Sequence, residues 1–186
     1  TYQNEMAPRV SMRKNFKNGW AVKGTISRGF SPPTVAELLP STGIISTNLE
    51  AEEGWNYEAT LIYRLLKNKL TLEATGFYFK LNNALVQRRD VSGADFFINA
   101  GDTRQKGIEL SADYFTSFRR GILESFILNS SWTLNHFRYG NFVKGADNFS
   151  GKTIPSVPAR TYSLLADMQF RKGFYSQATY YAASLI

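Results

Sequence analysis

Two arginines and two aromatic residues stand close together in a polar stretch of this sequence, as Arg88, Arg89, Phe96 and Phe97. An arginine side chain can bind a carboxylate or a phosphate through two parallel hydrogen bonds. The flat face of a phenylalanine ring can stack on a ring of a ligand. We therefore predict that these residues bind an anionic ligand. The alternative is that they are solvated loop charges and aromatic anchors, or contacts to surface polysaccharide.

A second group with similar chemistry follows later in the chain: His136, Arg138, Tyr139 and Lys144. We predict that it contributes to the same ligand site. His136 is the only histidine and the chain has no cysteine, so neither a thiolate site nor a histidine cluster can hold a metal. The sequence therefore predicts no metal site and no bound cofactor.

No set of residues has the spacing of a catalytic site. The chain lacks the Gly-x-Ser-x-Gly turn of a serine nucleophile and a glycine-rich phosphate loop. Glu109 and Asp113 share one face of a predicted strand, but carboxylates of this kind are common in barrel linings. Basic pairs such as Arg119 and Arg120 are dispersed and form no stripe for nucleic acid. We predict neither an enzyme nor a nucleic-acid-binding protein.

The elements that position these residues are predicted to be strands. The chain has 186 residues, a formal net charge of +7, 43% hydrophobic and 15% aromatic residues. No apolar run approaches the roughly 18 residues of a membrane-spanning helix, which excludes a helical membrane protein. Apolar residues instead alternate with polar ones, for example from Tyr162 to Phe170. A period of two places successive side chains on opposite faces of a sheet, so the pattern predicts an all-β protein.

We predict eight strands in an antiparallel up-and-down meander, at residues 6–16, 20–30, 52–66, 70–82, 102–115, 122–136, 159–170 and 174–186. Short and long connections alternate between them. The long ones, near residues 31–51, 83–101 and 137–158, all fall at one end of such a sheet. Transmembrane β-barrels have this asymmetry, with short periplasmic turns and long extracellular loops.

The two predicted faces of the sheet differ in polarity. The polar parity is predicted to line the interior of a barrel: Lys23, Thr25, Ser27, Glu58, Thr60, Glu109, Asp113, Ser163, Asp167 and Gln169. The apolar parity is predicted to contact outer-membrane lipid, with aromatic residues gathered near both strand ends. The strand at residues 70–82 departs from this pattern, because its apolar residues change parity near Gly76. Either a bulge shifts its phase there, or its inner face touches something buried.

Four segments of the sequence resemble one known family. Residues 29–38 (GFSPPTVAEL) resemble the Gly-Phe-Arg-Ala-Pro-Ser…Glu-Leu box of TonB-dependent outer-membrane receptors. Residues 48–58, 99–110 and 154–161 are similar to that family's Asn-Leu-Lys-Pro-Glu…Trp-x-Tyr-Glu, Asn-Ala-Gly…Gly-Val-Glu-Leu and Ile-Pro-x-Val-Pro-x-x-Thr segments. Ser31 and Ala51 depart from the usual Arg and Pro. We also expect residues 34–39 to form a short helical turn after the two prolines.

The resemblance implies a 22-stranded barrel closed around a plug domain, in the outer membrane of a Gram-negative cell. Residues 1–186 would form part of the later barrel, with the plug and the TonB box upstream and the last strands missing. The implied function is TonB-driven uptake of a scarce solute, most often a ferric siderophore. The implied partners are the receptor's own plug, TonB, outer-membrane lipid and the solute. The isolated segment is expected to self-associate through its open strand edges.

Two other functions remain open from the residues alone. Eight strands can close into a small outer-membrane barrel with a structural or adhesin role. A soluble β sandwich or barrel with a binding role would bury both faces of the sheet under protein.

Overall fold

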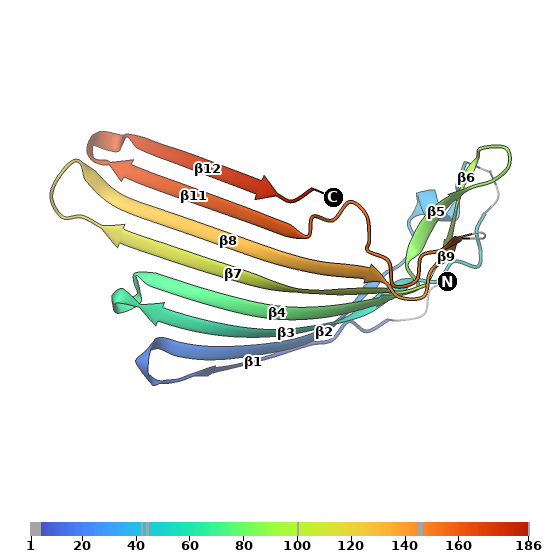
Figure 1. Cartoon of the computed structure of the whole chain (residues 1–186), viewed down its shortest axis with the longest axis horizontal. Helices are drawn as coiled ribbons and strands as arrows, with labels where there is room; N and C mark the ends of the chain where they lie inside the picture. The colour runs from blue at the N-terminus through green and yellow to red at the C-terminus, as the bar shows by residue number, and fades with distance from the viewer. Residues whose placement is uncertain (1–4, 42, 44, 100, 145–146, 186) are drawn as a thin grey trace.

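The computed structural model describes residues 5–41, 43, 45–99, 101–144 and 147–185. Eight strands form one antiparallel sheet in the order β1-β2-β3-β4-β7-β8-β11-β12 (Figure 1). Their bounds are β1 Arg9–Asn15, β2 Trp20–Ser31, β3 Glu52–Leu65, β4 Leu70–Asn82, β7 Thr103–Ser117, β8 Leu123–Tyr139, β11 Arg160–Phe170 and β12 Tyr175–Ala183. The predicted all-β meander of eight strands is confirmed. No helix among the described residues is long and apolar enough to cross a membrane.

Short turns join the strands at one end of the sheet. Three are single 3-10 turns, η1 Lys17–Gly19, η2 Leu66–Asn68 and η3 Arg171–Gly173. Each has a residue with positive φ, which tight hairpin turns require. The fourth connection joins β7 to β8, and there the Phe118 amide donates to the Glu124 carbonyl.

The three long connections lie at the opposite end and contain small elements of their own (Figure 1). These are α1 Val35–Leu38, the hairpin of β5 Leu85–Arg89 with β6 Asp95–Asn99, and the pair β9 Val143–Lys144 with β10 Asp147–Asn148. The expected helical turn after Pro33 is α1. The Thr34 hydroxyl accepts from the Glu37 amide and the Glu37 carboxylate accepts from the Thr34 amide, which is a capping box.

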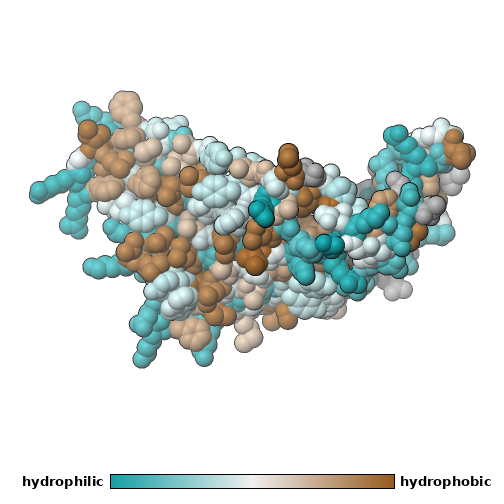
Figure 2. All heavy atoms as spheres, in the orientation of Figure 1, coloured by the Kyte–Doolittle hydropathy of each residue, from teal (hydrophilic) through white to brown (hydrophobic). Residues whose placement is uncertain are grey.

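The two faces of the sheet follow the predicted parities. On β2 the outward residues Val22 and Ile26 are 44% and 48% exposed, whereas the inward residues Ala21 and Thr25 are 0% and 3% exposed. The polar face is therefore the sheltered inner one. The face that Figure 2 shows carries apolar side chains along the strands, and hydrophilic ones lie toward both the short turns and the long loops. All ten residues predicted for the barrel interior lie on the inner face, as the strand registers show.

Strand β4 contains no bulge, so the first explanation for its change of parity is wrong. Its register with β3 and with β7 is continuous along its length. Its inward Phe77 instead covers Gly107, where an added Cβ would lie 2.6 Å from the ring. Phe79 covers Gly54 in the same way, at 2.5 Å. The aromatic rings fill space left by glycines on the neighbouring strands, so apolar residues on both faces are compatible with one regular strand.

The sheet does not close on itself. Among the described strands, β1 and β12 each pair with one neighbour, and β1 does not pair with β12. The alternative of a complete eight-stranded barrel is therefore wrong for this fold. Among the small elements of the loops, α1 contacts β6, and Arg88 of β5 donates to the Val143 carbonyl of β9. No second layer of described residues covers the outer face, which disagrees with a sandwich.

Candidate ligand-binding site in the long loops

The first two long loops form one packed unit. The Asn99 side-chain amide donates to the Glu50 and Asn83 carbonyl oxygens at 2.9 and 2.7 Å, and its oxygen accepts from the Glu50 amide at 2.7 Å. The Asp95 amide donates to the Ser41 hydroxyl at 2.8 Å. These contacts fix the β5–β6 hairpin against the first loop. Asn99 and Ser41 were not predicted as site residues, because no local pattern marks a side chain that joins two loops.

The hairpin places Arg88 and Arg89 on opposite faces. Arg88 stands directly opposite Phe96, and Arg89 opposite Asp95. The Arg89 guanidinium forms an ion pair with Asp95 at 2.9 Å and its side chain is 74% exposed. Phe97 shares the face of Arg89. The structure therefore divides the predicted group into two pairs, Arg88 with Phe96 and Arg89 with Phe97.

Arg88 reaches from the hairpin to the third loop. One terminal guanidinium nitrogen donates to the Val143 carbonyl at 2.8 Å. Its Nε is buried and has no hydrogen-bond partner among the described residues. A buried donor without an acceptor is costly, so this atom is a place where an anionic group would be stabilised.

A hollow of about 620 Å³ lies between the hairpin and the first loop. Phe96 and Phe97 line it together with Ile45, Leu49 and Ile98. Its lining also includes the Ser46, Thr47, Asn48, Glu50 and Asn99 residues. The two predicted aromatic residues thus share one cavity although they lie on different faces of the hairpin.

The second predicted group is not a single cluster. His136 and Arg138 lie in β8 on the outer face, and Arg138 Nε donates to His136 Nε2 at 2.8 Å. Tyr139 has the opposite parity and packs with Phe142, at 4.6 Å between ring centroids, in the third loop. Lys144 lies in β9, and its side chain is outside the described part of the structure. Strand β8 extends to Tyr139, beyond the predicted end at 136, and alternation then separates these residues.

Asp102 fastens the third loop to the start of β7. Its carboxylate accepts from the Asn141 amide at 2.7 Å, and its carbonyl accepts from the Gly140 amide. Gly101 has a φ of +94°, and a Cβ there would lie 1.5 Å from the Asn141 carbonyl oxygen, so the turn requires glycine. Gly101 and Asp102 belong to the segment 99–110, which resembles a segment of the family. That resemblance predicted a turn here but not its contact with the third loop.

The inner face below the loops is polar and carries both charge signs. A hollow of about 410 Å³ is lined by Arg13, Lys23, Glu58, Glu73 and Glu109. The described residues contain no group of three His, Cys, Asp or Glu side chains placed to hold a metal ion. The arrangement supports noncovalent binding at the loops above a polar interior.

A family model described as "TonB dependent receptor-like, beta-barrel" matches residues 1–184. The chain belongs to this family. The predicted membership is confirmed, and with it the location of the barrel in the outer membrane. The family comprises receptors and transporters. The division of residues 1–186 from a plug domain and a count of 22 strands remain predictions.

Curated relatives are "Iron-regulated outer membrane virulence protein" from two strains of Vibrio cholerae serotype O1. Each is 25% identical over 175 residues, which cover 87% of this chain and 26% of the relative. The chain thus spans about a quarter of the length of these relatives.

Solved structures with the same fold include the copper transporter OprC, with a TM-score of 0.66, 15% identity, and coverage of 95% of this chain and 25% of that one. The FrpB iron transporter from Neisseria meningitidis has a TM-score of 0.60 at 18% identity, covering 89% of this chain and 24% of that one. The siderophore receptor PirA from Pseudomonas aeruginosa has a TM-score of 0.61 at 17% identity, covering 95% and 33%.

Proposed function

We propose that this chain is part of the wall and the outer loops of a receptor that imports a ferric siderophore across the outer membrane. The observation that carries the proposal is the family match over residues 1–184, together with a relative that is named as iron-regulated. Import suits a site built from loops whose described residues offer guanidinium and aromatic groups for binding. The rest of the receptor would supply a plug, which would pack against the polar inner face, and the segment that engages TonB.

Arg88, Arg89, Phe96, Phe97 and Tyr139 are the residues that we propose to contact the ligand. The Nε of Arg88 is buried and has no hydrogen-bond partner in the described part of the chain, and the side chain joins two loops, so Arg88 is the residue whose charge an anionic chelate would use most directly. Phe96 and Phe97 line the hollow of about 620 Å³, where a ring of the ligand would stack. His136 and Arg138 point away from this hollow, on the outer face of β8.

The test is iron uptake by cells that lack the parent gene. Cells complemented with the wild-type gene should accumulate radioactive iron from at least one ferric siderophore in a panel. Cobalamin and copper are tested in parallel as alternative solutes. Loss of a charge-assisted hydrogen bond costs roughly 1.5–3 kcal/mol, so Arg88→Gln should raise the half-saturating concentration about 10- to 100-fold. Arg120→Gln, at the short-turn end, is the matched control and should leave uptake unchanged. If the wild-type gene restores uptake of cobalamin or copper but does not restore uptake of any iron chelate, the siderophore assignment is contradicted.

A further inference from the structure

The residues that join β6 to β7 hold both partners of the Arg88 hydrogen bond. We name Asn99, Gly101 and Asp102 the β6–β7 junction. The Gly101 carbonyl accepts from the Ala84 amide at 3.2 Å, directly before the first residue of β5. The Asn99 side-chain amide donates to the Asn83 carbonyl at 2.7 Å. The junction therefore fixes the base of the β5–β6 hairpin, which carries Arg88.

Asp102 fixes the third loop, which carries the other partner of that hydrogen bond. Its carboxylate accepts from the Asn141 amide at 2.7 Å, its carbonyl accepts from the Gly140 amide at 2.7 Å, and its amide donates to the Asn141 carbonyl at 3.3 Å. Two residues further along the loop, the Val143 carbonyl accepts from the Arg88 guanidinium at 2.8 Å. The acceptor that orients Arg88 is therefore held in place through Asp102.

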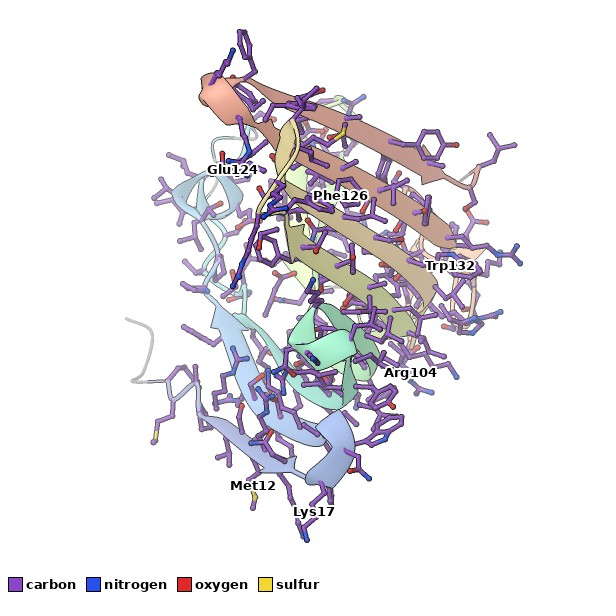
Figure 3. All side chains as sticks on the ribbon, turned by 90° about the vertical axis from the view of Figure 1, so that its left-hand side faces the viewer. Met12, Lys17, Arg104, Glu124, Phe126 and Trp132 are labelled. Atoms are coloured by element: carbon purple, nitrogen blue, oxygen red, sulfur yellow. The ribbon has the colours of Figure 1, made fainter. Side chains whose placement is uncertain are left out.

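The carboxylate of Asp102 is closely packed, and its side chain is 19% exposed. A Cβ added at Gly140 would overlap this carboxylate, so the third loop approaches Asp102 as closely as a glycine permits. Arg104 lies on the outer face with Trp132 (Figure 3), and its Nε is 3.7 Å from a carboxylate oxygen of Asp102. That separation is too long for a hydrogen bond. The position of the carboxylate is therefore set by the backbone of the third loop.

Strand β7 gives the junction a firm anchor. It begins at Thr103, directly after Asp102, and Thr103 pairs with Leu81 of β4 and with Tyr139 of β8. Thr103 is also buried. A buried strand that pairs on both sides opens less readily than a loop. The third loop is therefore tied to the wall of the sheet and not only to another loop.

We propose that Asp102 is a positioning residue for the ligand site. It holds the third loop so that the Val143 carbonyl orients the Arg88 guanidinium toward an anionic ligand. This inference rests on the proposed function, in which Arg88 contacts the ligand. Asp102 does not belong to the lining of the loop hollow, so it acts through the loop backbone and not by touching the ligand.

The physical reason is the shape of the guanidinium group. Because the group is planar, a hydrogen bond from one terminal nitrogen to a fixed carbonyl also fixes the direction of its Nε–H. In Arg88 that Nε is the buried donor with no partner among the described residues. A donor that is already oriented binds an anion without the cost of ordering a mobile side chain. Loss of the Asp102 contacts should therefore weaken binding although every group that touches the ligand is still present.

The test measures binding of a ferric tricatecholate, an anionic chelate with aromatic rings, to the purified full-length parent receptor. Asp102→Ala should raise the dissociation constant roughly 10-fold, which is the scale of coupling within one hydrogen-bond network. Asp102→Asn keeps an oxygen that can accept from the Asn141 amide, so it should bind like the wild type. The matched control is Asp167→Ala, which removes a carboxylate that accepts from Gln177 near the short-turn end and should leave the dissociation constant unchanged.

A double variant shows whether Asp102 acts through Arg88. In the Arg88→Gln background, Asp102→Ala should change the dissociation constant by less than about twofold, because the side chain that it positions is already absent. Equal losses in both backgrounds would overturn the proposal. Binding by Asp102→Asn that is as weak as binding by Asp102→Ala would also overturn it.

A distance measurement without ligand separates this inference from the proposed function. Nitroxide labels at Val91 and Asp147, two exposed positions in the hairpin turn and in β10, report the distance between the hairpin and the third loop. The distance distribution should be narrow in the wild type and broader in Asp102→Ala, and an unchanged distribution would overturn the proposal. Absence of chelate binding by the wild type would count against the proposed function, whereas the label distances decide whether Asp102 positions the loop.

Gly140→Ala tests the same contact if Asp102→Ala fails to assemble. It keeps the carboxylate but places a Cβ against it, so it should weaken chelate binding and broaden the label distances as Asp102→Ala does. Gly29→Ala, at a position where an added Cβ meets no atom within 4 Å, is its control and should behave like the wild type. A Gly140→Ala receptor that migrates as a folded barrel on unheated gels and binds the chelate like the wild type would overturn the proposal.

Discussion

Replacing Leu164 with arginine tests whether the apolar face of the sheet contacts hydrocarbon. Leu164 lies opposite Ser130 on β8 and Tyr180 on β12, in the outward parity of β11. It stands between Tyr162, toward the loops, and Phe170, at the short turn, which places it near the middle of the apolar belt. Its neighbour Ser163 has the opposite parity and lies 2.8 Å from the Ser131 hydroxyl on the inner face.

The expected penalties differ because the two side chains face different media. An outward arginine at the bilayer midplane costs roughly 2–4 kcal/mol. Ser163→Arg introduces the same side chain into a polar interior, where the loss is that of one hydroxyl hydrogen bond, about 0.5–1.5 kcal/mol. Met168→Arg, on the outward parity but close to η3, should cost only about 0–1 kcal/mol because it lies near the interface.

The assay is guanidinium unfolding of the parent receptor in lipid vesicles, followed by tryptophan fluorescence. The free energy of unfolding should fall most for Leu164→Arg, and by much less for Ser163→Arg and Met168→Arg. Equal losses at Leu164 and Ser163 would refute the assignment of faces. Equal losses at Leu164 and Met168 would keep the faces but contradict the position of the membrane along the strand.

Three further predictions concern glycine packing, a loop carboxylate and the isolated chain. Gly107→Ala should lower the free energy of unfolding by about 1–3 kcal/mol, because its Cβ would lie 2.4 Å from the Leu134 carbonyl oxygen. A Cβ at Gly29 meets no atom within 4 Å, so Gly29→Ala should leave the free energy of unfolding unchanged in the same guanidinium titration. In the turn between β5 and β6, the Ser92 hydroxyl, with the Ala94, Ser92 and Gly93 amides, holds the pKa of Asp90 below its usual range. The stabilisation of the turn by the Asp90 carboxylate is therefore present above the ordinary carboxyl pKa, and it is lost as the pH falls through the lowered pKa. Ser92→Ala should raise the pKa of Asp90 in an NMR titration of the carboxyl group. An unchanged pKa would exclude the Ser92 hydroxyl as the main cause. The isolated chain should associate without detergent through β1 and β12, and a dilute monomer in sedimentation velocity would contradict that.

The strands were the most predictable part of this fold. Residues 52–66 and 70–82 were predicted, and β3 and β4 span Glu52–Leu65 and Leu70–Asn82. Alternation is a strong signal when one face meets lipid, and polar short turns limit where a strand can end. The hairpin of β5 and β6 was not predicted, because its two strands are only five residues each, and its position depends on contacts with the first loop, such as those of Asn99.

The candidate site was less predictable because small errors in strand ends change the face on which a residue lies. The strand predicted at 122–136 continues to Tyr139 in β8. Three additional strand residues place Arg138 on the outer face, on the same parity as His136 at the predicted strand end, and leave Tyr139 on the inner side. Residue type indicates the chemistry of the group, basic side chains that suit an anion, but the parity of β8 decides which side of the sheet each of them faces.

The same parity separates arginines that the sequence placed in one predicted ligand site. The Arg88 side chain acts among the loops, with a buried Nε and a contact to Val143. Arg138 lies on the outer face of β8, and it does not belong to the lining of the loop cavity. A soluble chelate that enters among the loops would therefore meet Arg88 and not Arg138, because Arg138 lies on the outer face of the sheet. Arg138→Gln should accordingly leave the half-saturating concentration for iron uptake unchanged, whereas Arg88→Gln should raise it; equal increases for the two variants would contradict this separation of the two arginines.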